Sequence, residues 1–329
     1  MSDELLETFI KQYIESQSMP QVLFTWHGGE PMLRGIDFYK KVLQIEEKYA
    51  RRRIIDNVLQ TNGLLMNEEW AEFLHDNGFL VGISIDGPEE LHNAHRGNTF
   101  HKVMHAIELL KEFNVMWNAM VVVSNTNATH PIEVYNFFKR INAKYIQFTP
   151  LVRTDHLRNG FKDAINPFLW GDFLCKIFDE WVKEDVGEYF INIFDATLAN
   201  WMGETPGPCC FAPTCGQVGV IEYNGDVYSC DHFVYPEYKL GNIKEHTFIE
   251  MLFGEQQKKF GRNKWSTLSH KCRKCKYLFA CNGECPKNRY TENEYGETGL
   301  NYLCEGYYKF FEHVAPFMNT MTRQKIPTD

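Results

Sequence analysis

The chain has 329 residues, of which 44% are hydrophobic and 23% charged, a composition typical of a globular protein with one large and one smaller domain. Its formal net charge of −9 argues against broad electrostatic binding of nucleic acid or of an anionic membrane. No apolar run approaches the length of a membrane span, and the first residues do not form a signal peptide, so we expect a cytoplasmic protein. Thiols stay reduced in the cytoplasm, so the ten cysteines favour metal or cluster ligation over disulfides.

Short apolar strands alternate with helices over the first half of the chain. Helical periodicity is found in residues 3–16, 36–49, 67–76, 100–113 and 131–140, with Ser2 as a plausible N-cap of the first helix. Apolar runs predict five strands, in residues 22–26, 54–60, 79–85, 115–123 and 144–148. This alternation predicts an α/β fold with a parallel sheet, in which the active site forms at the carboxyl ends of the strands.

A glycine-rich segment follows the first predicted strand. Gly28 and Gly29 lack a Cβ atom, so the backbone there can approach a ligand closely. Glu30 then offers a carboxylate to an ammonium group or to a backbone N–H. A lone Gly-Gly-Glu segment is as often, or more often, an ordinary tight turn with a helix-capping glutamate.

Other polar segments also fall at predicted strand ends. They are residues 60–63 and 84–87, with Arg96 on a connecting loop. Ser84 and Asp86 are equally compatible with simple turn residues. The shared position of these segments favours one common site.

The second half begins with a predicted amphipathic helix over residues 168–182, in which Cys175 is most simply a packed core thiol. Residues 190–201 mix aromatic and polar side chains, and they either line a pocket or pack in the core. Farther on, Asn224 and Gly225 predict a β-hairpin turn that brings Cys215 and Cys230 together.

Eight of the ten cysteines form an ordered array in the last third of the chain. They are Cys209, Cys215, Cys230, Cys272, Cys275, Cys281, Cys285 and Cys304. Eight thiolates suffice for two four-cysteine sites. The spacing suits two structural zinc sites as well as two [4Fe–4S] clusters, and it favours the clusters only slightly.

The array resembles the SPASM domain of radical SAM enzymes. Together with Gly225, its cysteines follow the pattern C-x9-G-x4-C, then C-x2-C-x5-C-x3-C, then a last cysteine. The first half resembles the radical SAM partial (β/α) barrel. More closely, the chain resembles the anaerobic sulfatase-maturating enzymes in residues 26–30, 59–63, 228–232, 240–243 and 301–304. The resemblance implies a barrel in residues 1–152, a helical connector in residues 153–206, and a SPASM-like α+β auxiliary-cluster domain with a C-terminal helix in residues 207–329.

The resemblance also implies roles for individual residues. Gly28, Gly29 and Glu30 would hold the amino end of S-adenosylmethionine (SAM), Ser84 and Arg96 would contact its carboxylate or ribose, and Leu151 would border the adenosyl part. Cys209, Cys215, Cys230 and Cys285 would hold one auxiliary [4Fe–4S] cluster, and Cys272, Cys275, Cys281 and Cys304 the other. Asp231 would be the catalytic base, with Gln60 and His232 near the substrate.

The implied reaction is the radical SAM oxidation of a cysteine or serine in a sulfatase polypeptide to Cα-formylglycine. The implied partners are that polypeptide and an electron donor such as flavodoxin or ferredoxin; we expect a monomer that binds neither nucleic acid nor membrane. Two alternatives stay open. One is a SPASM maturase that acts on another ribosomal peptide, and the other is a non-catalytic module that binds clusters or zinc.

One family motif is absent from the sequence. The C-x3-C-x2-C segment, which holds a third [4Fe–4S] cluster with one open iron, does not occur in these 329 residues, and Cys175 and Cys210 are wrongly placed to replace it. We therefore expect Met1 to be an internal start in an N-terminally truncated form that also lacks the first barrel strand. We expect this chain, as given, not to cleave SAM reductively.

Overall fold

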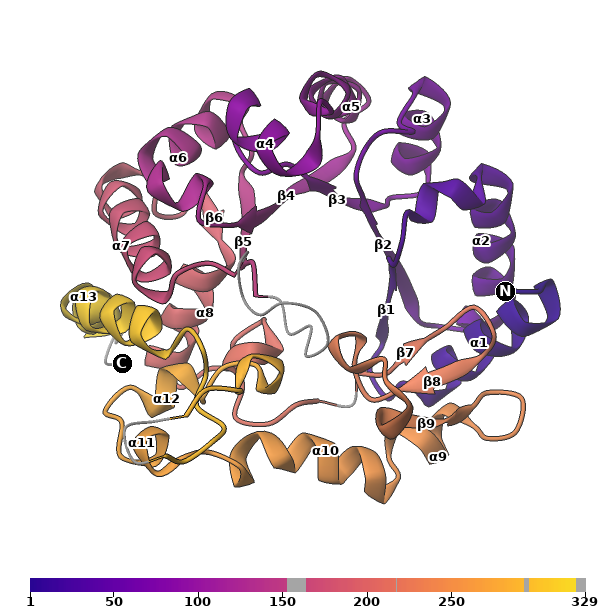
Figure 1. Cartoon of the computed structure of the whole chain (residues 1–329). Coiled ribbons are helices and arrows are strands. Elements are labelled where there is room, and N and C mark those ends of the chain that lie inside the picture. The colour runs from indigo at the N-terminus through magenta and orange to yellow at the C-terminus, as the bar shows by residue number, and fades with distance from the viewer. Residues whose placement is uncertain (153–163, 217, 293–295, 324–329) are drawn as a thin grey trace, which may run out of the picture. The chain divides into compact units, whose positions relative to one another are not determined.

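The structure is a computed structural model and describes residues 1–152, 164–216, 218–292 and 296–323 (Figure 1). Its larger sheet has six strands in the order β1-β2-β3-β4-β5-β6, and the pairs β1–β2, β4–β5 and β5–β6 are parallel. These strands are β1 (Gln21–Trp26), β2 (Ile54–Thr61), β3 (Leu80–Ser84), β4 (Met116–Val123), β5 (Tyr145–Pro150) and β6 (Phe190–Ile191). The predicted α/β class with a parallel sheet is confirmed.

Helices follow most of these strands. Those of the first two thirds are α1 (Asp3–Ser16), α2 (Ile36–Ala50), α3 (Glu68–Asp76), α4 (Glu89–Arg96), α5 (Phe100–Glu112), α6 (Pro131–Arg140), α7 (Pro167–Glu184) and α8 (Asn192–Trp201). Those of the last third are α9 (Phe248–Leu252), α10 (Glu255–Ser266), α11 (His270–Arg273), α12 (Leu278–Cys281) and α13 (Cys304–Arg323). Among the described residues no helix is both long and apolar enough to cross a membrane.

Two elements of the sheet region differ from the sequence predictions. The prediction placed Arg96 on a loop, but Arg96 is the last residue of α4, whose buried positions are only Leu91 and His92. So little apolar surface leaves a weak helical pattern. The prediction also missed the sixth strand, β6, because it is only two residues long and runs directly into α8.

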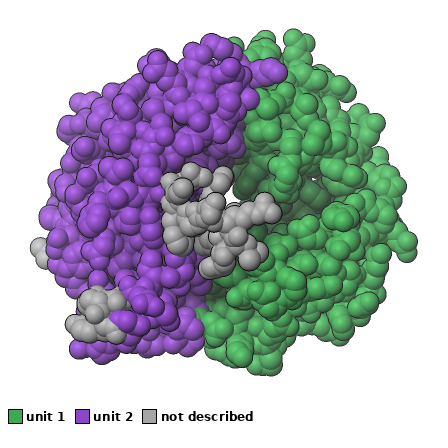
Figure 2. Space-filling model, viewed as in Figure 1, with its two compact units in different colours: residues 1–82, 105–116, 215–263 green, residues 83–104, 117–214, 264–329 purple. Residues whose placement is uncertain are grey.

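The chain forms two compact units (Figure 2). Unit 1 comprises Met1–Gly82, His105–Met116 and Cys215–Asn263. Unit 2 comprises Ile83–Met104, Trp117–Thr214 and Lys264–Asp329. Both units therefore combine segments of the barrel with segments of the cysteine-rich third.

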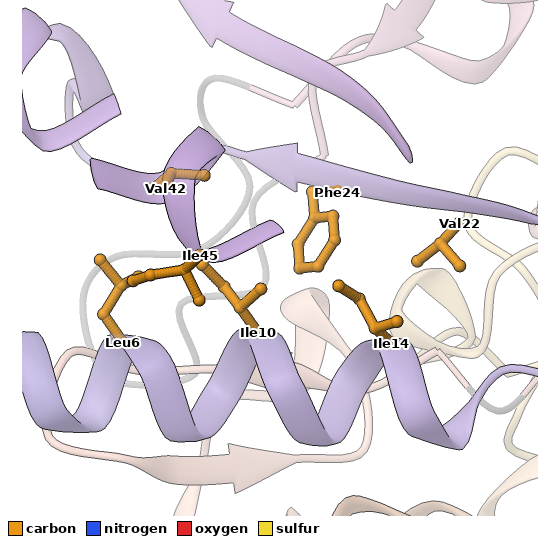
Figure 3. Close-up of a cluster of buried hydrophobic side chains, with 7 residues drawn as sticks. All are labelled: Leu6, Ile10, Ile14, Val22, Phe24, Val42 and Ile45. Atoms are coloured by element: carbon orange, nitrogen blue, oxygen red, sulfur yellow. The ribbon is translucent and has the colours of Figure 1, made fainter. Parts of the chain in front are cut away.

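In unit 1, helix α1 packs against two apolar cores. The Ser2 hydroxyl accepts a hydrogen bond from the Leu5 backbone N–H, so the predicted N-cap is confirmed. One core contains Leu6, Ile10, Ile14, Val22, Phe24, Val42 and Ile45, which join α1, β1 and α2 (Figure 3). The other contains Leu5, Val227, Ile243, Phe248, Met251 and Leu252. Burial of a side chain of this size contributes about 1.5–3 kcal/mol, so α1 fixes residues 215–263 to β1 within one unit.

A small antiparallel sheet lies in the second of these cores. Its strands are β7 (Val220–Ile221), β8 (Asp226–Tyr228) and β9 (Lys239–Asn242), in that order. Strands β7 and β8 form the hairpin that Asn224 and Gly225 predict. Strand β9 was not predicted.

In unit 2, helices α7 and α13 approach each other very closely. A Cβ atom on Gly171 would lie 2.8 Å from the carbonyl oxygen of Gly306, and one on Gly306 would lie 2.2 Å from that of Pro167. Glycine is therefore required at both positions. Because α13 begins at Cys304, this contact fixes the position of the last cysteine of the array.

Candidate active site

The Gly-Gly-Glu segment follows β1 in unit 1. Gly28 and Gly29 have φ angles of +92° and +54°, a region of backbone conformation that favours glycine. Among the described residues, no atom lies within 4 Å of the position a Cβ would take on either glycine, and both are exposed. The backbone conformation, and not crowding, therefore requires glycine here, and the main chain is left accessible to a ligand.

Glu30 joins the ends of β1 and β2. Its Oε1 accepts hydrogen bonds from the backbone N–H of Met32 (3.0 Å) and the hydroxyl of Thr61 (2.8 Å), and its Oε2 accepts one from the backbone N–H of Asn62 (2.9 Å). The capping role that the alternative interpretation predicted is therefore present. Contact between Glu30 and the amino group of SAM stays a prediction.

Gln60 lies one residue before Thr61 on β2. Side chains of a strand alternate between its faces, and Asn57, Leu59 and Thr61 are buried on one face. Gln60 therefore lies on the opposite face with Val58, and it is only half-buried. Its contact with substrate stays a prediction.

Asp231 lies close to two histidines in unit 1. Its Oδ1 accepts a hydrogen bond from the Cys230 thiol (3.1 Å), and its Oδ2 lies 4.0 Å from Nδ1 of His232. Burial would raise the pKa of Asp231, but His232, the Cys230 thiol and His27 together hold it below its usual value. The predicted base is thus within electrostatic reach of His27, the residue before the glycine pair. A cluster-bound Cys230 is a thiolate and does not donate this hydrogen bond.

Gln257 on α10 connects the two chain segments at the base of the β7–β8 hairpin. The sequence analysis did not identify this residue. Its Nε2 donates to the carbonyl oxygens of Gly216 and Ser229, both at 3.1 Å. These two residues are the sequence neighbours of Cys215 and Cys230. Gln257 is buried, and a buried glutamine on an otherwise polar helix leaves no distinctive signal in the sequence.

In unit 2, Asp86 and Arg96 form an ion pair. The buried Asp86 carboxylate accepts hydrogen bonds from Nε (2.5 Å) and Nη2 (3.0 Å) of Arg96 and from the backbone N–H of Val122 (2.9 Å). Asp86 therefore orients Arg96, a role that the turn interpretation did not predict. Ser84 ends β3 and Leu151 follows β5, and SAM contacts of Ser84, Arg96 and Leu151 stay predictions.

One predicted cluster-binding set lies entirely in unit 2. It consists of Cys272 on α11, Cys275, Cys281 at the end of α12, and Cys304 at the start of α13. Burial and then the Cys272 thiol are the leading causes that raise the pKa of Cys304 to about 12. Burial and then the Cys304 thiol raise the pKa of Cys281. The thiols are thus electrostatic neighbours, and Leu268, Leu278 and Leu300 pack with Cys272 and Cys304.

Backbone amides also point at these sulfur atoms. The N–H of Tyr277 donates to Sγ of Cys275 (3.4 Å), and the N–H of Gly283 donates to Cys281. Amide donors stabilise thiolates, so the donors and the four neighbouring thiols fit an iron–sulfur cluster. In the described part of the chain, no three His, Cys, Asp or Glu side chains converge on the position of a single metal ion. A [4Fe–4S] cluster has a different requirement, because each thiolate binds its own iron atom.

The other predicted set is divided between the units. In unit 2, burial, Glu284 and, more weakly, Cys209 raise the pKa of Cys285 to about 12, so Cys209 and Cys285 are neighbours. Cys210 lies close to both. Cys215 and Cys230 belong to unit 1. The grouping of these two pairs into one site stays a prediction.

Comparison with known proteins tests the resemblance. Residues 1–138 match the radical SAM superfamily, and residues 209–276 match SPASM, an iron–sulfur cluster-binding domain. A serine-type anaerobic sulfatase-maturating enzyme of Bacteroides thetaiotaomicron is 56% identical, over 98% of this chain and 83% of that protein. The chain belongs to the anaerobic sulfatase-maturating enzyme family.

Other members of the family show the same relationship. A cysteine-type anaerobic sulfatase-maturating enzyme of Clostridium novyi (strain NT) is 36% identical over 95% of this chain and 85% of that protein. The solved structure of native anSMEcpe with bound AdoMet and Kp18Cys peptide has a TM-score of 0.90 at 33% identity, over 98% of this chain and 91% of that one. The chain is therefore a radical SAM oxidoreductase by family, and its fold is that of the anaerobic sulfatase-maturating enzymes.

Proposed function

We propose that this sulfatase-maturating enzyme, in a form that also carries the C-x3-C-x2-C motif, oxidises the side chain of a cysteine or serine in a sulfatase polypeptide to Cα-formylglycine. The observation that carries the proposal is the position of Asp231, directly after the predicted cluster ligand Cys230 and within electrostatic reach of His27 at the Gly-Gly-Glu segment. A carboxylate beside the segment proposed to hold SAM could take a proton from a substrate.

Different residues of the chain would bind SAM and remove the substrate proton. Gly28, Gly29 and Glu30 would hold the amino end of SAM, and bound SAM supplies the carbon radical that removes one hydrogen atom from the substrate β-carbon. Asp231 would take the S–H or O–H proton, and one electron would leave the substrate. A serine then yields the aldehyde directly, and a cysteine yields a thioaldehyde that water converts to the aldehyde with release of hydrogen sulfide.

The cysteine array would carry the electron away from the substrate. Cys209, Cys215, Cys230 and Cys285 would hold one [4Fe–4S] cluster, and Cys272, Cys275, Cys281 and Cys304 the other. Four protein ligands leave no iron open, so these clusters would serve electron transfer or structure and would not bind substrate. An electron donor such as flavodoxin or ferredoxin, a monomeric state and a cytoplasmic location complete the proposal.

Mass spectrometry of a peptide substrate tests this function. A form of the enzyme that also carries C-x3-C-x2-C is incubated anaerobically with SAM, reductant and matched sulfatase-motif peptides that contain serine or cysteine. We expect an aldehyde in place of the target side chain in at least one peptide. Its absence from both, with 5′-deoxyadenosine formed, would refute the proposed reaction.

The base role has its own test. Asp231→Asn should lower turnover by about 10²–10⁴-fold, because the amide cannot take the proton, while the iron content stays at the wild-type level. Asp226→Asn is the matched control, since Asp226 lies in the same unit and its carboxylate pairs with Lys239 (2.6 Å). Turnover of Asp231→Asn within twofold of the control would refute the base role.

A further inference from the structure

The segment between Cys281 and Cys285 has an unusual backbone. Asn282, Gly283 and Glu284 have φ angles of +48°, +69° and +52°, so three successive residues lie in the left-handed region. Glycine adopts this region freely and asparagine does so with little cost, but glutamate does not. Strained residues of this kind persist only where surrounding contacts hold them, and they concentrate at functional sites.

The Glu284 side chain is buried and is held by two asparagines. A single oxygen atom, Oε2, accepts hydrogen bonds from Nδ2 of Asn288 (3.0 Å) and Nδ2 of Asn301 (2.5 Å). All three side chains are among the buried polar groups of unit 2. The carboxylate therefore joins two chain segments that lie 13 residues apart in sequence, residues 288 and 301.

Each asparagine is hydrogen-bonded through its backbone to a cysteine, and the two cysteines belong to different predicted clusters. The backbone N–H of Asn288 donates to the carbonyl oxygen of Cys285 (3.0 Å). The carbonyl oxygen of Asn301 accepts from the backbone N–H of Cys304 (3.0 Å), and its Oδ1 accepts from that of Leu303 (2.7 Å). Asn301 thus orients the start of α13, where Cys304 lies.

Arg289 and Lys264 hold the same segment from its backbone side. The Arg289 guanidinium donates to the carbonyl oxygens of Asn282 (2.9 Å), Gly283 (2.8 Å) and Glu284 (3.0 Å), and to that of Lys264 (2.5 Å). The Lys264 ammonium is fully buried and donates to the carbonyl oxygen of Cys209 (2.6 Å). The polar network therefore extends from Glu284 to the first cysteine of the array.

We propose that Glu284 is a positioning residue that joins the ligand segments of both auxiliary clusters, through Asn288 and Cys285 on one side and through Asn301 and Cys304 on the other. The inference rests on the proposed ligand sets of the two clusters. It explains why a glutamate occupies a backbone position that disfavours it: its carboxylate makes hydrogen bonds that a glycine would not make.

Iron and acid-labile sulfide, counted per folded chain after anaerobic reconstitution, give the direct test. Two loaded clusters correspond to about eight iron atoms per chain. Glu284→Ala should lose at least about half of this iron, and the electron paramagnetic resonance signals of both clusters should weaken. Asn301→Ala should weaken only the signal that Cys304→Ala also removes.

Three variants separate the carboxylate from backbone strain and from general destabilisation. Glu284→Gln keeps an acceptor oxygen and should retain most of the iron. Glu284→Gly relieves the strained φ but removes the carboxylate, so it should lose iron as Glu284→Ala does. Asp185→Ala is the matched control, because the buried Asp185 also accepts two hydrogen bonds at one oxygen, from Tyr135 (2.7 Å) and Lys139 (2.8 Å), away from the cysteines.

The outcomes distinguish this inference from the function on which it rests. A wild-type chain without iron in either auxiliary site would refute the ligand sets, and the inference with them. A fully loaded wild type with fully loaded Glu284→Ala or Glu284→Gly would refute the inference alone. Iron loss confined to one cluster in Glu284→Ala would also refute the inference. Asp185→Ala should have a lower melting temperature at normal iron content, and iron loss in this variant equal to that in Glu284→Ala would refute the inference as well.

Discussion

The barrel wall around α1 and the cysteine-rich segments after residue 264 are held together by different contacts. In the barrel wall, buried Leu, Ile, Val and Phe side chains from α1, β1 and α2 form one continuous apolar core. In the cysteine-rich segments, α11 and α12 are only four residues long each, and charged or amide side chains bind many backbone carbonyl oxygens. Helices this short are not stable by themselves.

The two regions differ in how far their stability depends on a bound group. An apolar core forms without any ligand, so the barrel wall should keep its structure when the clusters are removed. Of the four cysteines predicted to hold a cluster there, Cys272 is buried and Cys275, Cys281 and Cys304 are half-buried. Such thiols would gain their stabilisation mainly when a metal group binds them, because metal binding at a four-cysteine site is coupled to folding. The two regions should therefore respond differently to the same treatment.

Removal of iron should produce the largest effect. A chelator under anaerobic conditions should increase amide hydrogen exchange in residues 270–285 by at least about tenfold, because the short helices there lose their anchoring thiolate bonds. Exchange in α1 and β1 should stay within about twofold of the untreated protein. Mass spectrometry of peptic fragments measures both regions in one sample.

Two results would contradict the expectation that only the cysteine-rich segments depend on bound iron. Equal increases in both regions would show that the barrel wall also depends on the clusters. Unchanged exchange in residues 270–285, with iron loss verified, would show that side-chain hydrogen bonds alone hold the cysteine-rich segments.

Truncation of the barrel core gives the reverse experiment. Phe24 is 2% exposed, and Phe24→Ala should lower the free energy of unfolding by about 3–5 kcal/mol, because it removes apolar contacts and leaves a cavity. Urea titration followed by tryptophan fluorescence measures the change. Leu23→Ala on the same strand is the control, since Leu23 is 49% exposed and should change stability by no more than about 0.5 kcal/mol.

The folded fraction of Phe24→Ala should also bind iron normally. Iron loss in that fraction, at the level expected for a cysteine variant, would contradict the separation of the two regions. Equal destabilisation by Phe24→Ala and Leu23→Ala would instead contradict the assignment of the core.

The barrel was the easier region to predict from sequence, for the same physical reason. Apolar periodicity reports burial, and burial is what holds the barrel, so five strands and most helices were predicted to within one or two residues. Helix α4 and strand β6 were missed because one has few apolar residues and the other has only two residues. Helix α8 was also not predicted, because residues 190–201 mix aromatic and polar side chains. Weak burial patterns give weak predictions.

In the cysteine-rich third, spacing predicted the ligands but not what supports them. The array identified eight cysteines, and it gave no indication of Glu284, Arg289, Lys264 or Gln257. Lys264 and Gln257 act through hydrogen bonds to backbone atoms that lie far away in sequence, such as the bond from Lys264 to Cys209 across 55 residues. Glu284 accepts hydrogen bonds from the side chains of Asn288 and Asn301, and Arg289 donates to nearby backbone carbonyl oxygens and to that of Lys264. No local pattern encodes such contacts, so only the three-dimensional structure shows them.

One residue is an exception within the barrel wall. Glu46 on α2 is 3% exposed, and its Oε2 accepts a hydrogen bond from Nδ2 of Asn57 (2.9 Å). Among the described residues, its Oε1 has no hydrogen-bond partner. Burial raises the pKa of Glu46 from its ordinary value of 4.5 to about 7, against the opposing effect of Asn57. The apolar wall thus contains one polar contact that depends on pH.

The direction of the pH effect follows from this raised pKa. Between pH 4.5 and about 7 the folded chain holds a proton on Glu46 that the unfolded chain has already lost, so stability falls as pH rises through this window. Above pH 7 the full cost is present, and it corresponds to at most about 3 kcal/mol. Glu46→Gln removes this titration and keeps an acceptor for Asn57. At pH 8 the variant should therefore be more stable than wild type by up to about 3 kcal/mol, and at pH 5 by much less.

Urea unfolding of wild type and Glu46→Gln at a series of pH values measures the difference. Glu47→Gln is the control, because Glu47 is the exposed neighbour of Glu46 on the same helix and should show no such trend. A stability difference that stays constant from pH 5 to pH 8 would mean that Glu46 is not the titrating group. The barrel wall would then be stabilised by apolar burial without this exception, and its contrast with the polar cysteine-rich segments would be sharper than the structure indicates.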